Sequence, residues 1–245
     1  MVFKFFLPLG LYAVVASWLL PTLSSPPMMQ NHAPKVTITS PAKTSKFQWS
    51  AVIPYSIAVA DQEDGKTEYD EIANQEVFLS VRYLADSVDV KKYLQLGSRT
   101  SQEVLFSIST TTCFNCHQVK TKLIGPSFES IARKYPDNEA SVKMLVGKVL
   151  SGTSGTWGDV QMPPHPDLKA ERVEAIVRWI LKNGADPDQN HFVGVEGAFR
   201  TRERPVSNPG KAVYVLTATY TDHGENGAVA SRKLGQHTVI LKSKP

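Results

Sequence analysis

The sequence predicts two structural classes in one chain: an all-α domain at residues 99–186 that is inserted in, or flanked by, an all-β sandwich. Apolar and polar residues alternate in several stretches of 34–98 and 187–245, which is the period of strands with one buried face. Between these segments, apolar residues recur with the spacing of amphipathic helices. Both cysteines of the chain lie in this helical part, three positions apart.

Length and charge limit the function classes. The chain has 245 residues, which is enough for two domains. With 42% hydrophobic residues it can form a packed core without disulfides. The formal net charge is +4 and Lys and Arg form no long cluster, so nothing indicates a nucleic-acid-binding protein.

Residues 1–25 have the features of a secretory signal peptide. Lys4 precedes an apolar run from Phe5 to Leu20, and the small residues Ser24 and Ser25 follow. The run is short for a membrane span and contains a proline and a glycine. We expect export with cleavage of this segment; the alternative is an uncleaved membrane anchor. The absence of a nearby cysteine excludes a lipoprotein attachment.

Residues 34–98 are expected to form the first part of the β-module. Three strands are expected, in PKVTITSP, in AVIPYSIAVADQEDG and in EVFLSVRYL. Short alternating strands separated by turns are typical of a β-sandwich. The words VTITSP and IAVADQEDG also resemble the start of bacterial Ig-like repeats of the PKD type.

The two cysteines and the histidine that follows, CFNCH, match the C-x-x-C-H attachment signature of c-type haem. Two thiols on one helical turn can add to the two vinyl groups on one porphyrin edge, and the next residue then lies under the iron. The alternative is a redox C-x-x-C motif with a Cys113–Cys116 disulfide, since exported proteins keep disulfides. The three preceding threonines and His117 favour haem.

Around this motif, roughly over residues 99–186, the chain resembles the small bacterial class I cytochromes c. Four blocks occur in the family's order and spacing: CFNCH, KLIGPSFESIARKY, KVLSGTSGTWGDVQMPPHP and AERVEAIVRWILKN. The resemblance implies an all-α fold with one haem c, bound covalently to Cys113 and Cys116. It implies His117 as the proximal ligand of the iron and Met162 as the distal ligand.

Two further residues have roles in the family. The resemblance implies that the carbonyl of Pro126 accepts a hydrogen bond from the proximal imidazole, which orients the ring and raises its basicity. Pro126 is also suited to a helix start. Trp157 resembles an aromatic residue that hydrogen-bonds a haem propionate, and the alternative is a packing role.

The residues themselves favour Met162 over the other methionine after the haem motif. Met144 lies in ASVKMLVGKVL, where the apolar spacing is that of a helix, so we expect it in the core. Met162 lies in an irregular stretch that Pro163 and Pro164 make stiff, and a stiff loop holds a thioether at a fixed distance from iron. The alternative for Met162 is an ordinary loop hydrophobe.

The last helical block carries an apolar stripe: Val173, Ile176, Val177, Ile180 and Leu181. In the family this helix crosses the first helix, here near 101–111, over one haem edge. We expect Trp179 in that packing region.

Residues 187–245 return to the alternation of strands. KAVYVLTATYTDHGENG and QHTVILK are expected strands, and another is expected around 192–200. Three strands before the helical unit are too few for a closed sandwich, and so are two or three after it. We therefore expect the two segments to complete one Ig-like sandwich with the helical domain inserted at a loop. The alternative is two separate small β-modules.

Several polar residues are expected to have ordinary roles. An acidic loop lacks EF-hand spacing, so a solvated turn is favoured over a Ca²⁺ site: Asp61, Glu63, Asp64 and Asp70. His165 is expected to be an exposed loop residue rather than an iron ligand. Four lysines are expected near the exposed haem edge, either to steer an acidic redox partner or as ordinary surface residues: Lys120, Lys122, Lys143 and Lys148.

A six-coordinate haem has no open position for a substrate, so we expect electron transfer and no enzyme activity. A methionine ligand and burial raise the potential. We expect a periplasmic carrier that passes single electrons from a dehydrogenase-type donor to a respiratory acceptor through the exposed haem edge. A haem peroxidase is another option, but it usually needs a second haem motif, and this chain has one haem motif.

Similar pairings of an Ig-like module and a monohaem cytochrome occur at the C-terminal ends of large bacterial proteins that contain a quinoprotein sugar dehydrogenase domain. The resemblance implies such a dehydrogenase as donor and a terminal oxidase or another cytochrome as acceptor, each on a separate chain. Contact with a membrane is expected only if the N-terminal segment is kept. The alternative function is a β-module that binds carbohydrate or another protein, with the haem as a relay or sensor. This alternative requires Tyr214 or Tyr220 to face solvent.

Overall fold

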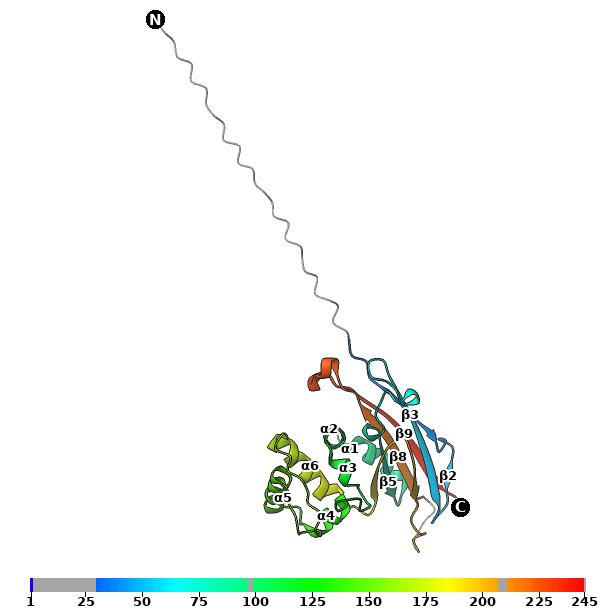
Figure 1. Cartoon of the computed structure of the whole chain (residues 1–245). Helices are drawn as coiled ribbons and strands as arrows, with labels where there is room; N and C mark the ends of the chain where they lie inside the picture. The colour runs from blue at the N-terminus through cyan, green and yellow to red at the C-terminus, as the bar shows by residue number, and fades with distance from the viewer. Residues whose placement is uncertain (2–29, 97–98, 207–210, 245) are drawn as a thin grey trace. The chain divides into compact units, whose positions relative to one another are not determined.

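A computed structural model describes residue 1 and residues 30–96, 99–206 and 211–244 (Figure 1). Apart from Met1, the expected signal peptide lies outside these residues. The described chain forms two β-sheets and a group of helices. No helix among the described residues has both the length and the apolar content that a membrane span requires.

One sheet has four strands, in the order β1-β3-β4 with β7 paired to β3, and the other has five strands in the order β2-β9-β8-β5-β6. The strands of the four-stranded sheet are β1 (Lys35–Ser40), β3 (Val52–Asp61), β4 (Gly65–Lys66) and β7 (Glu196–Arg200). Those of the five-stranded sheet are β2 (Lys46–Phe47), β5 (Phe78–Leu84), β6 (Gln189–Val193), β8 (Val213–Thr221) and β9 (Leu234–Ser243).

Both sheets contain strands from before and after the helical part. In the five-stranded sheet β5 pairs antiparallel with β8, with Leu79 opposite Ala218. In the four-stranded sheet β3 pairs antiparallel with β7, with Ile53 opposite Phe199. Strands from before and after the helical part are therefore hydrogen-bonded within the same two sheets.

The strand expected around 192–200 is two strands, β6 and β7. Gly194 lies between them with φ +110°, a backbone conformation that residues other than glycine rarely adopt. Its N–H donates to the carbonyl of Val77 at 2.8 Å, which holds the break against β5. Alternation of apolar residues does not reveal such a break, because both halves continue the same pattern.

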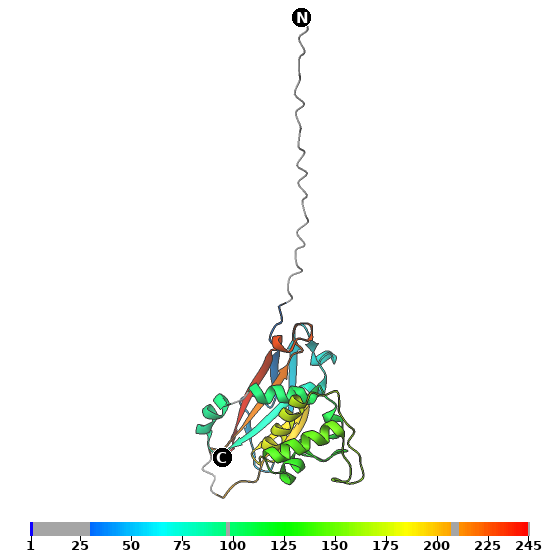
Figure 2. The same cartoon turned by 90° about the vertical axis from the view of Figure 1, so that its left-hand side faces the viewer.

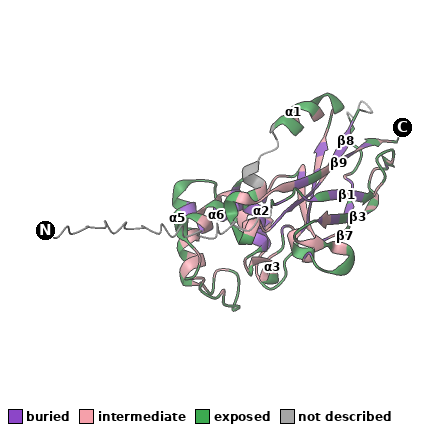
Figure 3. Cartoon of the chain, turned by 90° about the horizontal axis from the view of Figure 1, so that it is seen from above, coloured by how far each residue is buried: buried purple, intermediate pink, exposed green. Residues whose placement is uncertain are grey.

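Strand β8 is buried on both faces (Figure 3). One face packs in the core between the sheets, where Tyr214 is 5% and Tyr220 is 1% exposed. The other face is met by a helix, and Thr219 Oγ1 donates to Gln102 Oε1 at 2.8 Å. The solvent-facing tyrosines that carbohydrate binding required are therefore absent from this strand.

The helices are α1 (Val90–Leu96), α2 (Arg99–Ser109), α3 (Cys113–Cys116), α4 (Phe128–Lys134), α5 (Glu139–Ser151) and α6 (Ala170–Asn183). Helix α1 lies in the segment where only strands are expected. The turn before it is capped by Asp86, whose Oδ1 accepts from the N–H of Val88 at 3.0 Å. In the sequence, Asp86 in the stretch DSVDVKKYLQL is the signal that indicates this helix.

The helices pack against the five-stranded sheet through an apolar cluster (Figures 1 and 2). The cluster joins β5 to α2 and α6 and includes Phe78, Val104, Leu105, Ile108, Trp179 and Ile180. Phe78 is 3% exposed, while its neighbour Leu79 faces the core between the sheets. Strand β5 is thus shared by both cores. Trp179 packs where α2 and α6 meet, as expected. The centroid of its ring also lies 5.0 Å from that of His191 in β6.

A histidine after β8 joins two loops of the β-module. His223 Nδ1 lies 3.1 Å from Asp64 Oδ1, and Nε2 lies 3.1 Å from Glu76 Oε1. A neutral imidazole has one N–H and can donate only once, so both contacts require the imidazolium. Burial lowers the pKa of His223, but the hydrogen bonds and charges of Glu76 and Asp64 outweigh it and raise the pKa above its ordinary value.

This arrangement predicts a pH-dependent stability. Because the folded pKa lies above the unfolded value of 6.5, the stabilisation is complete below pH 6.5 and is lost as the pH rises through the folded pKa. Its size is about 1 kcal/mol or less, since the side chain is 45% exposed and solvent screens it. Urea unfolding at a series of pH values measures this. The His223→Gln variant should lose the dependence; an unchanged pH profile in that variant contradicts the prediction.

Candidate cofactor site

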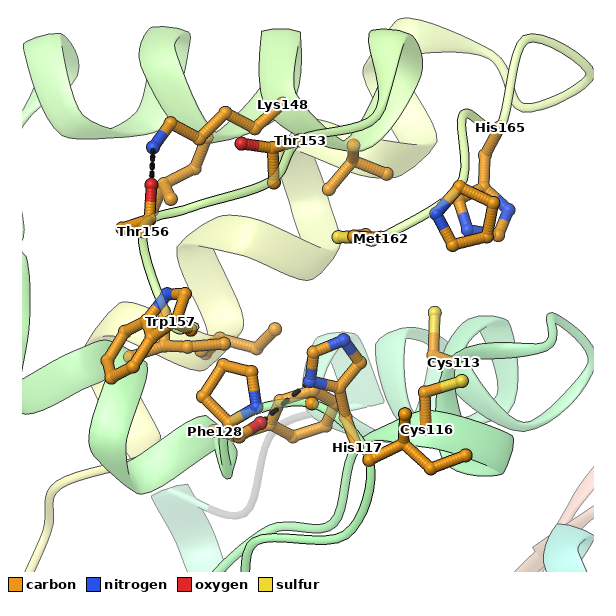
Figure 4. A pocket seen from close by; sticks show the side chains of 18 of the residues that line it. Cys113, Cys116, His117, Phe128, Lys148, Thr153, Thr156, Trp157, Met162 and His165 are labelled. Carbon is orange, nitrogen blue, oxygen red and sulfur yellow. Dashed lines mark hydrogen bonds between the residues drawn. The ribbon is translucent and has the colours of Figure 1, made fainter. Parts of the chain in front are cut away.

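The two cysteines lie on one short helix, α3, and His117 follows where the helix ends. The N–H of His117 donates to the carbonyl of Cys113 at 2.9 Å, which closes the turn. Both cysteines are free thiols, so the disulfide alternative is absent from the structure. Burial raises the pKa of the Cys113 thiol, and Thr111 Oγ1 donates to its sulfur at 2.9 Å. The two thiols lie on one edge of a cavity (Figure 4).

His117 is held in one orientation. Its Nδ1 lies 2.7 Å from the carbonyl oxygen of Pro126, which requires Nδ1 to be the protonated donor and leaves the Nε2 lone pair free. Burial lowers the pKa of His117 below its ordinary value, partly opposed by this hydrogen bond. The ring stacks on Phe128 at 5.9 Å between centroids and 19° between planes. A neutral imidazole with a fixed tautomer is suited to bind a metal.

Glycine is required beside this ring. A Cβ on Gly125 would lie 2.5 Å from His117 Cε1 and 2.9 Å from Nδ1. The helix start expected at Pro126 lies two residues later, because Ser127 is the N-cap of α4 and its Oγ accepts from the N–H of Ser130 at 3.1 Å. Pro126 is thereby left in the loop that holds His117.

Met162 lies on the opposite wall of the cavity. Its N–H donates to the carbonyl of Thr153 at 2.9 Å, and the N–H of Thr153 donates to the carbonyl of Met162 at 3.0 Å. Figure 4 shows the Met162 sulfur across the cavity from the His117 ring. Met144 is 40% exposed and not in the core as expected, because α5 turns its apolar side, with Val142, towards α6.

The cavity has a volume of ≈ 350 Å³ and mostly apolar walls. Helices α5 and α6 supply much of the lining: Leu145, Val149, Val173, Ile176, Val177 and Ile180. Two sulfur atoms on one edge, a nitrogen on one wall and a thioether on the other match the donor set that a covalently bound haem requires. The residues present therefore fit this cofactor.

Trp157 and Lys148 line one polar end of the cavity, and Lys134 lies beside Trp157. Lys148 lines the cavity and its Nζ donates to Thr156 Oγ1 at 3.2 Å, so it does not belong to the expected surface ring. Lys134 Nζ donates to the carbonyl of Thr156 at 3.2 Å and lies 4.4 Å from the centre of the Trp157 ring. Sequence reasoning missed Lys134, whose signal is its place beside Tyr135 in the ARKY block.

The other expected lysines differ in position. Lys120 is 24% exposed, and its Nζ donates to the carbonyls of Gly184 and Asp186 at 3.2 and 3.3 Å. It therefore holds the end of α6 instead of facing a partner, and burial lowers its pKa. Lys122 and Lys143 are exposed.

Two further expectations concern metal binding. His165 is half-buried and lines the cavity, whereas an exposed position was expected. In the acidic loop, Asp61 Oδ1 accepts from the N–H groups of Glu63 and Asp64, which makes the loop a self-bonded turn. Within the described ranges, no group of three or more His, Cys, Asp or Glu side chains is arranged to hold a metal ion.

Comparison with known proteins identifies relatives of the helical part. The family model for cytochrome c matches residues 106–184. Cytochrome c-552 of Nitrosomonas europaea is 42% identical over 69 residues, which are 28% of this chain and 67% of that protein. Cytochrome c-551 of Allochromatium vinosum is 41% identical over 69 residues, with 28% and 73% covered. The crystal structure of the wild-type Nitrosomonas europaea cytochrome is 39% identical and matches with a TM-score of 0.30, covering 31% of this chain and 93% of that one.

Proposed function

We propose, because this chain belongs to the cytochrome c family, that it passes single electrons in the periplasm from a dehydrogenase-type donor to a respiratory acceptor. Family members carry covalently bound haem c with iron, and haem c is the cofactor of this chain. Cytochromes c are electron carriers and not enzymes, and the helical part of this chain is a domain of that family. The donor, the acceptor and the compartment are proposals.

The assignment of ligands is also a proposal. In it, Cys113 and Cys116 would hold the haem through thioether bonds, and His117 and Met162 would be the protein ligands of the iron. The observation that carries it is the placement of the His117 ring and the Met162 sulfur on facing walls of an apolar cavity with both thiols on one edge. When bound, haem supplies an iron that changes between the ferrous and ferric states.

The chain's own residues would keep this site closed to chemistry other than electron transfer. His117 and Met162 would both hold the metal, one from each wall of the cavity, which would leave no side open to a substrate. The apolar walls exclude water and, with the thioether ligand, favour the ferrous state and a raised potential. Pro126 fixes the His117 ring through the 2.7 Å hydrogen bond. Trp157, Lys134 and Lys148 would hold the propionates at the polar end.

The proposed exchange surface is the rim of the cavity near the loop before α4. Ile124 and Val160 line the cavity and are 53% and 62% exposed, and Leu123 beside them is 47% exposed. Exposed Lys122 adds a positive charge there. An acidic redox partner would suit this surface. By the stated resemblance, we propose a quinoprotein sugar dehydrogenase as donor and a terminal oxidase or another cytochrome as acceptor.

For the β-module we propose an Ig-like sandwich that docks or spaces the electron-transfer domain. The pairing of β5 with β8 and of β3 with β7 supports a single sandwich interrupted by the helices. We also propose export: the apolar run of the first 25 residues supports it, and homologous c-type cytochromes are periplasmic.

Expression with a c-type haem maturation system tests the function. We expect a red protein whose haem stays attached in acidified organic solvent and which is oxidised and reduced reversibly by one electron. The variant with both Cys113 and Cys116 replaced by serine should lose covalent haem. A colourless wild-type protein, or haem that is extracted from it, contradicts the proposal.

Met162→Ala tests the distal ligand. The weak far-red band of ferric haem, which reports an iron–thioether bond, should disappear, and the reduction potential should fall. Met144→Ala is the matched control, because that methionine is 40% exposed on α5. Visible spectra and redox titrations of the two variants measure the effect. A band that survives in Met162→Ala shows that another residue is the ligand.

A further inference from the structure

The wall that carries Met162 also carries a second side chain able to bind iron. His165 lines the same cavity, and Figure 4 shows its ring on the wall of Met162, displaced towards the side of Cys113 and Cys116. The residue is half-buried. Among the described residues its side chain has no hydrogen-bond or ion-pair partner, so no such interaction holds the ring nitrogens.

The backbone holds both side chains on this wall. Met162 is bonded to Thr153 in both directions, at 2.9 and 3.0 Å, and the N–H of His165 donates to the carbonyl of Val149 at 3.1 Å. Gly152 allows close contact here, because a Cβ on it would lie 2.8 Å from the Met162 carbonyl oxygen. Pro163 and Pro164 stiffen the two positions between. The backbone is thus held at both positions, so an exchange of the two side chains would have to occur by side-chain rotation.

His165 and His117 line the same cavity and lie on different walls of it. The two imidazoles thus approach the space between the cavity walls from opposite sides. Imidazole is a common ligand of haem iron, and the axial ligand is a main determinant of the potential.

We propose that His165 is a reserve axial ligand, which binds the iron when the thioether of Met162 leaves it. The proposal rests on the proposed function, since it requires haem at this site. In the exchange the iron–sulfur bond breaks and an iron–nitrogen bond forms, with no electron gained or lost. A protonated ring gives its proton to water. Replacement of the thioether by imidazole lowers the potential, so the carrier has a second, lower-potential form.

The test uses the full chain with haem attached and compares Met162→Ala with Met162→Ala/His165→Ala. We expect low-spin ferric haem with two imidazole ligands in the first variant, seen by electron paramagnetic resonance, and loss of that signal in the second. Redox titration should give a lower potential for Met162→Ala than for the wild type. The matched control is Met162→Ala/His32→Ala, since His32 is a 51% exposed histidine before β1 that does not line the cavity, and it should keep the low-spin signal.

Each outcome decides the inference separately from the proposed function. High-spin haem in Met162→Ala, or low-spin haem that persists in the double variant, overturns the role of His165 but leaves the haem assignment intact. Wild-type protein without covalent haem overturns both. If Met162→Ala does not fold, Met162→Leu keeps the volume of the side chain without the sulfur, and the same comparison with His165→Ala applies.

Discussion

Replacement of Phe78 by alanine is expected to lower the free energy of unfolding by about 3–5 kcal/mol and to destabilise the haem domain together with the β-module. Phe78 is 3% exposed on β5, in the cluster that joins the sheet to α2 and α6. Its ring begins a series of contacts that leads to the proximal histidine. The distance between ring centroids is 6.0 Å from Phe78 to Phe114 and 6.0 Å from Phe114 to Phe128. Phe128 stacks on His117 with 5.9 Å between the ring centroids.

Denaturant unfolding followed by far-ultraviolet circular dichroism and by the haem spectrum measures this effect. Both signals should change at one midpoint, in the wild type and in the variant, and the midpoint should fall in Phe78→Ala. Tyr69→Ala is the control, because that aromatic residue is 61% exposed and should change the stability little. Two separate midpoints, with only the dichroism affected by Phe78→Ala, would show that the two parts unfold independently.

Gly125→Ala is expected to damage the cofactor site. The new Cβ would lie 2.5 Å from His117 Cε1, and the ring cannot move away without losing the Pro126 hydrogen bond and the stacking on Phe128. Overpacking of this kind costs about 1–3 kcal/mol, and the lost hydrogen bond adds about 1 kcal/mol. We expect less haem incorporated per chain and a lower unfolding midpoint.

The matched control for this substitution is Gly147→Ala in the interior of α5. A Cβ at Gly147 meets no atom within 4 Å, and alanine is a better helix former than glycine by about 1 kcal/mol. The control should therefore be neutral or stabilising, with normal haem content. Equal haem content and stability in both variants would contradict the argument that His117 is sterically confined by Gly125.

Local patterns predicted the elements whose chemistry lies within a few residues. The alternation in PKVTITSP, EVFLSVRYL and KAVYVLTATY corresponds to β1, β5 and β8, and the apolar stripe of AERVEAIVRWILKN to α6. The haem-attachment motif needs only two thiols and an imidazole on one turn, so its spacing, together with the blocks that follow it, indicates the cofactor. Period and spacing are properties of neighbouring residues, and a sequence displays them directly.

Exposure was predicted less well, because it depends on residues that are distant in the chain. Met144 has helical apolar spacing but is exposed. The alternation in KAVYVLTATY leaves open which face is buried, and the structure places Tyr214 and Tyr220 between the sheets. Lys148 and His165 have polar side chains in loop-like or surface-like contexts, and both line the cavity. Nothing within their own segments tells which wall they lie on.

By itself, the sequence determined the type of cofactor and the run of strands and helices, since both depend on contacts within a turn or a strand. Only the tertiary structure decided that strands from both sides of the helical part share the same sheets, that β5 belongs to two cores, and that Met162 and His165 lie on one wall opposite His117. The physical reason is that these features arise when segments far apart in the chain bury their apolar faces against each other. That burial is a property of the pair of segments and not of either one.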